Sequence, residues 1–344
     1  MKMTARRSQL AYFALGGTIA SVAAHGEGAL VKLKGSDLLY QLPTVRDWAD
    51  VDIFSFREVP SGDLVMDDIL DLVGHIRSCI RDGAEGVVIS QGTDTLEETA
   101  YLLDLLIEED VPVILTGAMR NATLPGADGA ANLLSALQVA ASGITVGLGA
   151  VVVLNDEIHA ARFVRKRHTS STATFGSPLA GPIGYVSEGD PKLLLRPCGR
   201  LIVRLPDSPP SVRVGLVPIG FDEDGAGLTA AVSGLDGVVL AAYGGGHVPA
   251  RLSPILEDIN RRIPIVLASR TFAGPMLSQT YAFEGAEIDL LRRGLISAGA
   301  MDAVRARILL RVLLMGGVSR SIVATTFQQA LSHDGALILD ARKG

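Results

Sequence analysis

The stretch that decides the fold is residues 10–21, LAYFALGGTIAS, in which an apolar run ends at two glycines followed by a threonine. The apolar run over residues 11–15 is short and uninterrupted, which is typical of a strand buried on both faces of a parallel sheet. The glycines let the backbone turn tightly and approach a ligand closely. We therefore predict that Thr18 lies just beyond the carboxyl end of a buried strand, where such sheets place their ligands.

A second motif of the same kind occupies residues 90–100, SQGTDTLEETA. It follows a short apolar run and precedes apolar residues at helical spacing over residues 95–107, so it also joins a buried strand to a helix. A carboxylate such as Asp94 at this position suits an ammonium group, and the Thr93 hydroxyl suits a bound water. Because parallel strands end at the same edge of a sheet, Thr18 and Thr93 are expected to converge on one crevice.

Each motif also has a purely local explanation. Thr18 would cap the segment after a tight glycine turn, and taken alone this is the simpler interpretation. Asp94 or Thr95 would cap the following helix, with Glu97 and Glu98 in its first turn favouring the helix dipole. Two independent caps, however, do not explain why both motifs follow buried strands of one sheet.

Short apolar runs alternate with helical patterns along the chain, which predicts mostly parallel sheets with right-handed crossovers. Between residues 196 and 213 there are four prolines and little helical pattern, which is typical of a linker. We therefore predict two α/β domains: a larger N-terminal domain with a mostly parallel sheet (1–200), a linker (201–213) and a smaller C-terminal parallel-sheet domain (214–344). The predicted strands are residues 11–15, 86–90, 112–115, 149–154, 214–217, 237–242 and 263–268, and the predicted helices are 66–80, 95–107, 303–314 and 319–331.

The composition excludes several classes of protein. The chain has 344 residues, 48% of them apolar and 20% charged, which predicts a globular fold, and its net charge of −6 does not favour nucleic acid or an anionic membrane as partner. The two cysteines, Cys79 and Cys198, make neither a disulfide framework nor a Cys-x-x-Cys pair, and the six histidines lack metal-binding spacing. We expect no metal and no organic cofactor.

The N-terminus places basic residues before an apolar run, as a signal peptide does. The run over residues 10–15 is too short for the hydrophobic region of such a peptide, and no small-residue cleavage site follows it. No later segment has 18 uninterrupted apolar residues. We therefore expect a soluble, cytoplasmic protein.

The two motifs together resemble the signature motifs of bacterial L-asparaginases and glutaminase-asparaginases. The resemblance extends over essentially the whole chain and is carried by LGGTIAS (15–21), QGTDTLEETAY (91–101), LTGAMR (115–120), GADGAANLLSA (126–136), VVVLNDEIHAAR (151–162), ATFGSPLAGPIGYV (173–186), YGGGHVP (243–249) and GLISAG (294–299). It implies an amidohydrolase that converts the side-chain amide of asparagine to aspartate and ammonia. It also implies a homotetramer built as a dimer of dimers.

The resemblance implies a role for each motif threonine. Thr18 would be the nucleophile that attacks the amide, and a neutral hydroxyl needs an adjacent base for this. Thr93 would act with Lys166 as its partner, and Asp94 would hold the α-amino group of the substrate. Amides around the glycine turns would stabilise the oxyanion, by roughly 3 kcal/mol per good donor. Lys166 is flanked by Arg165 and Arg167, and a basic run of this kind is more often only a solvated patch.

The same resemblance places further residues in the substrate-binding part of the site. Ser61 matches the serine that binds the α-carboxylate, and Gly62 and Gly92 are placed beside it. Glu287, seven residues before GLISAG, fits a glutamate that similar enzymes contribute across a subunit interface, with Glu284 as the alternative. Either glutamate could instead be an ordinary surface carboxylate.

The sequence departs from the family pattern at two places. Similar asparaginases activate the nucleophile with a tyrosine in a flexible loop, whereas residues 22–38 contain none and the first tyrosine afterwards is Tyr40, in a predicted helix. Gly62 replaces the usual glutamine that contacts the substrate amino group. The segment over residues 22–35 keeps the glycine-rich, polar composition of a mobile lid.

Three other interpretations remain open. The chain could hydrolyse glutamine or another β-amide, or be an amidotransferase-type subunit, although the few residues before the first strand argue against the additional N-terminal domain expected of the latter. A nucleotide-binding oxidoreductase is disfavoured because the sequence lacks G-x-G-x-x-G. A non-catalytic amino-acid-binding sensor on the same scaffold would explain the missing tyrosine.

Overall fold

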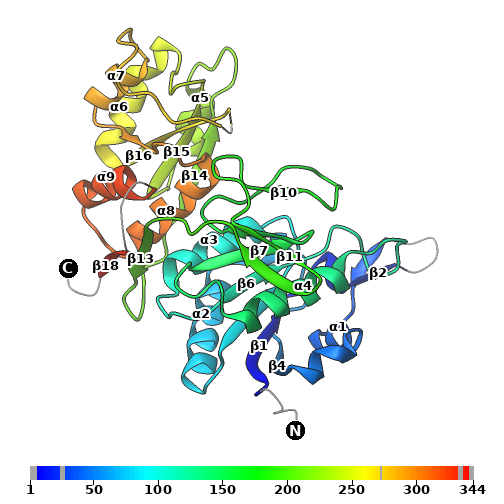
Figure 1. Ribbon diagram of the computed structural model, residues 1–344. Helices are drawn as coiled ribbons and strands as arrows, with labels where there is room; N and C mark the ends of the chain where they lie inside the picture. Colours follow the sequence, from blue (N-terminus) through cyan, green and yellow to red (C-terminus); the bar gives the residue numbers. More distant parts are fainter. Residues whose placement is uncertain (1–5, 24–27, 272, 332–335, 341–344) are drawn as a thin grey trace. The chain divides into compact units, whose positions relative to one another are not determined.

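The structure, a computed structural model, describes residues 6–23, 28–271, 273–331 and 336–340 (Figure 1). It divides into two compact units, Met1–Pro197 and Cys198–Gly344, which are described separately below. The first unit is built on a large, mostly parallel sheet and the second on a smaller parallel sheet, each covered by helices. The predicted fold class, two α/β domains with the larger parallel sheet first, is confirmed.

The first unit contains an eight-stranded sheet with the order β12-β11-β8-β7-β6-β5-β1-β4. Strands β4, β1, β5, β6 and β7 run parallel, and β8, β11 and β12 extend the sheet with antiparallel pairing. The predicted strands lie in the parallel part. The bounds are β1 (Ser8–Ala14), β4 (Ala49–Ser55), β5 (Gly86–Ser90), β6 (Val113–Thr116), β7 (Ala150–Leu154), β8 (Glu157–Ala160), β11 (Gly184–Ser187) and β12 (Asp190–Leu193).

Helices cover both faces of this sheet. Because successive residues of a strand point to opposite faces, Tyr12 and Val88 pack in the core under α4, whereas Phe13 and Ile89 point to the other face. Helix α3 contacts β6 and β7 and packs against α2. The bounds are α1 (Gly35–Tyr40), α2 (Met66–Arg81), α3 (Leu96–Leu106) and α4 (Gly129–Ser142), so the predicted helices 66–80 and 95–107 are confirmed within one or two residues.

Small elements after the strand ends complete the first unit. Three short 3₁₀ turns, η1, η2 and η3, and two hairpins, β2–β3 and β9–β10, join the main elements. Their bounds are η1 (Thr18–Ala20), η2 (Pro43–Asp47), η3 (Ser61–Asp63), β2 (Ser21–Ala23), β3 (Ala29–Val31), β9 (Arg165–Lys166) and β10 (Phe175–Gly176). The predicted lid lies largely in the β2–β3 hairpin, and its residues 24–27 lie outside the described residues.

The second unit has a four-stranded parallel sheet in the order β14-β15-β16-β17. Helix α8 contacts β14, β15 and β16, and a separate apolar core under α6 contains Val238, Leu240, Leu256 and Ile259. The bounds are β14 (Val214–Pro218), β15 (Gly237–Ala242), β16 (Ile265–Ser269), β17 (Ile296–Ser297), α5 (Ala226–Ala231), η4 (Ala250–Leu252), α6 (Ser253–Arg262), α7 (Glu287–Arg292), α8 (Ala303–Met315) and α9 (Arg320–Gln329).

The segment predicted as a linker, residues 201–213, includes most of a strand. β13 (Arg200–Arg204) pairs in parallel with β18 (Ala336–Asp340), far along the chain. Leu201, Ile202 and Val203 are buried in this pairing. Of the four prolines that suggested a linker, one precedes the strand and three follow it. Composition averaged over the whole segment concealed the short apolar run at its start.

A buried histidine ties β8 to the segment after β10. The His159 side chain is fully buried, with Nε2 3.2 Å from Oε2 of Glu157 and Nδ1 3.0 Å from the Ser177 hydroxyl. Since a carboxylate only accepts, Nε2 carries the proton and Nδ1 accepts from Ser177. Burial lowers the pKa of His159 below its ordinary value of 6.5, and the nearby Glu157 carboxylate opposes this only in part.

His159 should make stability depend on pH. Below pH 6.5 the unfolded chain binds a proton at His159 that the folded chain resists, so the free energy of unfolding should fall as the pH decreases from about 6.5 to 5. His159→Gln should weaken this dependence in urea unfolding measured over that range, whereas His75→Gln, at an exposed position, should leave it unchanged. An equally steep loss of stability in His159→Gln would contradict this role.

Candidate active site

Five residues predicted for the site line one cavity of about 470 Å³ in the first unit. Thr18 comes from the turn after β1, Ser61 from η3 after β4, and Gly92, Thr93 and Asp94 from the loop after β5. The β2–β3 hairpin lines the same cavity. The structure therefore brings the two threonine motifs together, as their positions after parallel strands predicted.

Backbone hydrogen bonds hold these loops at adjacent strand ends. The amide of Leu15 donates to the Ser90 carbonyl at 2.9 Å, and the amide of Gln91 donates to the Thr116 carbonyl at 3.0 Å. One strand away, the amide of Phe56 donates to the Ala14 carbonyl at 2.9 Å. Each loop thus leaves the sheet from a position fixed by its neighbour.

Two glycines let the loops approach more closely than side chains would allow. Gly17 has a φ of 81°, and a Cβ added there would collide with the backbone of Gly92. A Cβ on Gly92 would lie 2.9 Å from both Cβ and Oγ of Ser61. The three loops therefore pack backbone against backbone, which explains the glycine before each motif threonine.

Thr93, Asp94 and Lys166 form a connected polar group. The Lys166 ammonium donates to the Thr93 hydroxyl at 2.9 Å and contacts Oδ1 of Asp94 at 2.5 Å. Only 18% of the Lys166 side chain is exposed, compared with 82% of Asp94. The structure thus places Lys166 against Thr93 and not in a solvated basic patch, and leaves the Asp94 carboxylate open to a ligand.

Lys166 reaches this position from the β9–β10 hairpin, where it pairs with Phe175. Its backbone amide donates to Oε2 of Glu97, in the first turn of α3, at 2.7 Å. The hairpin is therefore attached to the helix that follows Thr93. The sequence had suggested only a helix-dipole role for Glu97, and no local pattern pointed to a partner 69 residues away.

Thr95 is the N-cap residue of α3, yet its side chain does not cap the helix. Its hydroxyl donates to the backbone carbonyl of Ser61 at 2.9 Å and accepts from the side-chain amide of Gln91 at 3.0 Å. Asp94 makes no capping bond either, since its carboxylate faces Lys166. The predicted side-chain cap is therefore wrong, because Thr95 bonds to Ser61 and Gln91 and Asp94 bonds to Lys166.

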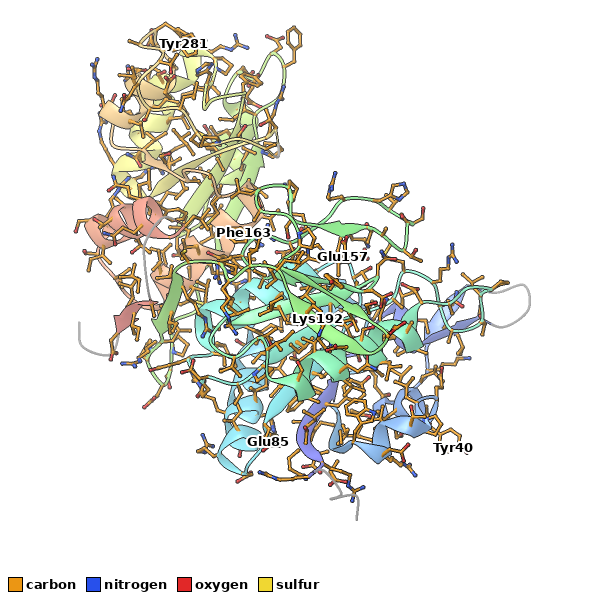
Figure 2. All side chains as sticks on the ribbon, in the orientation of Figure 1. Tyr40, Glu85, Glu157, Phe163, Lys192 and Tyr281 are labelled. Carbon is orange, nitrogen blue, oxygen red and sulfur yellow. The ribbon has the colours of Figure 1, made fainter. Side chains whose placement is uncertain are left out.

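The Thr18 side chain is half-buried in η1 and makes no side-chain hydrogen bond within the described part of the chain. Tyr40 cannot serve it, because it ends α1 with 80% of its surface exposed (Figure 2). Tyr12 is buried against Ser90, with its hydroxyl 2.7 Å from Oγ, and burial raises the pKa of Tyr12. A hydroxyl with a raised pKa stays protonated at neutral pH and cannot act as a base there.

Ser61 is 4% exposed at the start of η3. Next to it, Gly62 faces open space, since an added Cβ would meet no atom within 4 Å. Gly62 is itself exposed and is not among the residues that line the cavity.

Glu287 belongs to the second unit, where it begins α7 and is fully buried. One carboxylate oxygen accepts from the amides of Thr280 (2.9 Å) and Tyr281 (2.7 Å), and the other contacts Nε2 of His247 at 3.0 Å. Burial raises the pKa of Glu287, but these hydrogen bonds outweigh it and hold the pKa below the usual value. Within one chain, then, the carboxylate is already occupied.

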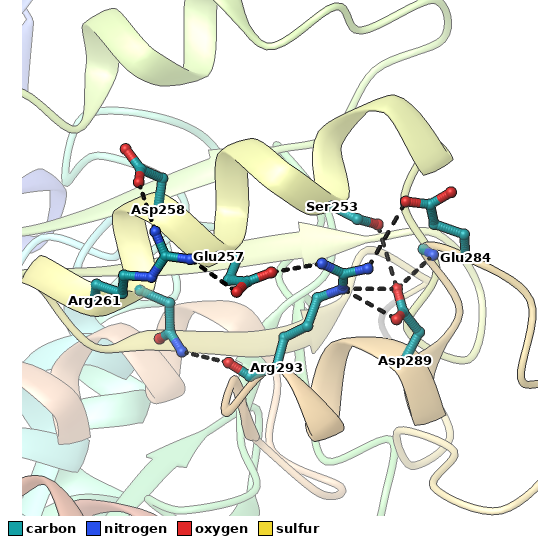
Figure 3. A network of polar contacts seen from close by, with 9 residues as sticks. Ser253, Glu257, Asp258, Arg261, Glu284, Asp289 and Arg293 are labelled. Atoms are coloured by element: carbon teal, nitrogen blue, oxygen red, sulfur yellow. Dashed lines mark hydrogen bonds and ion pairs between the residues drawn. The ribbon is translucent and has the colours of Figure 1, made fainter.

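Glu284 lies in an ion-pair network at the same end of the second unit (Figure 3). Arg293 is at its centre and contacts Glu257 of α6 at 2.6 Å, Asp289 of α7 at 3.0 Å and Glu284 at 3.7 Å. The Glu284 side chain is 56% exposed. The network joins α7 to α6 and so fixes the helix that carries Glu287.

The described residues form neither a cluster of metal-ligating side chains nor a membrane-spanning helix. They contain no group of three or more histidine, cysteine, aspartate or glutamate side chains that could hold a metal ion. None of their helices is long and apolar enough to cross a membrane.

The fold and the cavity define a class of protein: a two-unit α/β protein with hydroxyl, carboxylate and ammonium groups gathered at the carboxyl ends of parallel strands. Models of two families match the chain, one described as "Asparaginase, N-terminal" over residues 9–198 and one as "Glutaminase/Asparaginase C-terminal domain" over residues 213–327. The chain belongs to the asparaginase family. The predicted family and the predicted asparaginase-like amidohydrolase are thereby confirmed.

Individual relatives agree with this assignment. A "Probable L-asparaginase" of Deinococcus radiodurans is 38% identical over 263 residues, which are 75% of this chain and 80% of that protein. An "L-asparaginase" of Bacillus licheniformis is 34% identical over 314 residues, 89% of this chain and 95% of that protein. The crystal structure of a "Probable Cytoplasmic L-asparaginase" from Campylobacter jejuni has a TM-score of 0.84 at 28% identity and covers 94% of this chain and 99% of that one.

The glycine contact can be tested by Gly17→Ala. The added methyl group would collide with Gly92 and would have to occupy a left-handed backbone conformation, so the variant should lose about 3 kcal/mol of stability or fail to fold. Urea unfolding of the purified protein measures the loss. Gly74→Ala is the control. Gly74 lies in α2, where an added Cβ would meet no atom within 4 Å other than the backbone of its own helix. This variant should gain about 0.5–1 kcal/mol of stability. Equal stability of the two variants would contradict the close contact.

Proposed function

We propose that this protein hydrolyses the side-chain amide of asparagine to aspartate and ammonia, with Thr18 as the nucleophile. The observation that carries the proposal is the convergence of Thr18, Ser61, Thr93 and Asp94 on one cavity, with Lys166 bonded to Thr93. Family membership supports the amide as the reacting group.

Each charged group of the substrate would have a partner among the residues that line the cavity. Asp94, which is largely exposed, would bind the α-ammonium group, and the Ser61 hydroxyl would donate to the α-carboxylate. Holding both charged groups fixes the side-chain amide relative to Thr18 before reaction, which removes much of the entropic cost of the step. The missing glutamine at Gly62 leaves the ammonium mainly to Asp94.

The reaction would then proceed in two steps. The Thr18 oxygen attacks the amide carbon, the carbon–nitrogen bond breaks, and the nitrogen leaves as ammonia after taking up a proton. Water next attacks the ester carbon, releases aspartate and returns the proton to the Thr18 oxygen. Backbone amides of the glycine turns would stabilise the oxyanion in both steps. The Lys166 ammonium, through the Thr93 hydroxyl, would supply the proton to the departing nitrogen, and the proton lost by the Thr18 hydroxyl on attack would restore the ammonium.

A second candidate is the hydrolysis of a related amide, because Gly62 stands where the family pattern has the glutamine that contacts the substrate amino group. Ammonia release measured in parallel on asparagine, glutamine and larger β-amides decides between the two candidates. If no amide releases ammonia while aspartate still raises the melting temperature, the protein is an amino-acid sensor and both candidates fail.

Thr18→Ala should lower ammonia release by at least about a thousandfold, since the variant lacks the attacking atom. Aspartate should still raise its melting temperature, because Ser61 and Asp94 remain. Thr325→Ala, an exposed threonine of α9, is the matched control and should keep the native rate. Near-native turnover by Thr18→Ala would refute the assignment of the nucleophile.

We propose further that the active form is a homo-oligomer, a dimer of dimers, in which the Glu287 region of one copy meets the cavity of another. Because the Glu287 carboxylate is bonded within its own unit, a second copy would meet His247, whose ring packs against the partly exposed rings of Tyr281 and Phe283. Glu287 would then orient His247.

The cytoplasmic location stays a prediction, since one relative from Haemophilus influenzae is named "Probable L-asparaginase periplasmic".

Replacing both exposed rings, Tyr281→Asp with Phe283→Asp, should separate the copies and lower ammonia release in parallel, because two charges would be buried in the contact. Sedimentation velocity and an activity assay at the same concentration measure both effects. A separated form with full activity would contradict the requirement for a second copy.

A further inference from the structure

The first turn of α3 reaches outward to two other parts of the site. Thr95 and Glu97 lie in or just before this turn, directly after Thr93 and Asp94. Their side chains contact segments that are distant in sequence, Thr95 the Ser61 backbone and Glu97 the Lys166 backbone. Neither Thr95 nor Glu97 lines the cavity. Their contacts are therefore with the groups that hold the substrate and not with the substrate itself.

The Thr95 contact is directional. Gln91 is fully buried and its side-chain nitrogen donates to the Thr95 hydroxyl, so the hydroxyl proton is directed at the Ser61 carbonyl. The other amide atom of Gln91, Oε1, is buried without a hydrogen-bond partner among the described residues. Leaving this oxygen without a partner costs free energy. In the same orientation of the amide group, the Gln91 nitrogen donates to the Thr95 hydroxyl, which in turn donates to the Ser61 carbonyl.

The Glu97 contact fixes the other half of the site. Its carboxylate accepts the Lys166 amide at 2.7 Å, and the Lys166 ammonium lies 2.9 Å from the Thr93 hydroxyl. The strand that carries Lys166 is two residues long and pairs only with β10 among the described strands, outside the large sheet. The Lys166 backbone is thus bonded to the first turn of α3, and the Lys166 ammonium is bonded to Thr93, in the loop before the same helix.

We infer that Thr95 and Glu97 are positioning residues with separable effects: Thr95 sets the place of Ser61 and hence substrate binding, and Glu97 sets the place of Lys166 and hence the proton transfer. This inference rests on the proposed function of the cavity. It differs from a general structural role because each residue should affect a different kinetic parameter.

Thr95→Val keeps the shape of the side chain and removes both hydrogen bonds. It should raise KM for asparagine about tenfold and leave kcat within about twofold, since Ser61 grips the substrate equally in the ground and transition states. Thr95→Ser, which keeps the hydroxyl, should restore KM. Thr99→Val is the matched control, because Thr99 is buried one turn further along α3 and should leave both parameters unchanged.

Glu97→Ala removes the acceptor for the Lys166 amide. It should lower kcat about tenfold with KM within about twofold, because Lys166 acts on the departing group and not on the bound substrate. Glu97→Gln keeps an acceptor oxygen without the charge and should retain most of kcat. In the double variant with Thr95→Val the losses in kcat/KM should multiply, as for independent contacts.

Three outcomes would overturn the inference. Thr95→Val and Glu97→Ala could shift the same parameter, Thr95→Ser and Glu97→Gln could behave like the larger changes, or both variants could match the native enzyme. In each case the native enzyme still releases ammonia, so the proposed function survives. If the native protein releases no ammonia, the proposed function fails. The affinity for aspartate, measured by calorimetry, then replaces KM as the readout for Thr95. An unchanged affinity in Thr95→Val would overturn the Thr95 assignment as well.

Discussion

The site depends on one steric constraint, the contact of the Gly17 backbone with the Gly92 backbone. Parallel strands β1 and β5 lie side by side in the sheet, so the loops that leave them start only one strand spacing apart. Side chains at the two contact points would force the loops apart. With glycine at both, Thr18 and Thr93 face one cavity, and Ser61 fits against Gly92 from the third loop. The sheet sets the distance between the two loops, and glycine at both contact points lets the loops come close enough to line one cavity.

Around this contact the polar groups are arranged in two layers. Thr18, Ser61, Thr93 and Asp94 are among the polar residues that line the cavity. Behind them, Gln91, Thr95 and Glu97 connect the loops to one another and to the hairpin that carries Lys166. Short segments without regular structure would otherwise be free to move, and hydrogen bonds from the rigid start of a helix are an effective way to hold them. The same eleven-residue motif therefore both lines the cavity and bonds to the other segments around it.

The sequence predicted seven of the parallel strands, though not β4 or β17, and the convergence of the two motifs, because both follow from local apolar patterns and from the geometry of parallel sheets. Strands β5 and β15 begin and end at the predicted residues. The partners of Thr95 and Glu97 could not be predicted, since a threonine before a helix and a glutamate in its first turn each have a sufficient local explanation. The same holds for β13, whose partner strand lies far along the chain, and for the burial of Glu287, which depends on backbone amides that no pattern reveals. The antiparallel strands β8, β11 and β12 likewise pair through contacts that the helical and strand periods do not encode.

The β9–β10 hairpin has a consequence for the order in which the protein folds. The loops bearing Thr18, Ser61 and Thr93 belong to strands β1, β4 and β5, which are neighbours in the first part of the chain. Lys166 must instead close a loop of 69 residues to reach Glu97. Closing so long a loop is entropically costly and comes late unless other contacts shorten it. A chain in which β1, β4 and β5 are paired but the β9–β10 hairpin is not yet docked would therefore hold the Thr18, Ser61 and Thr93 loops together without the Lys166 ammonium.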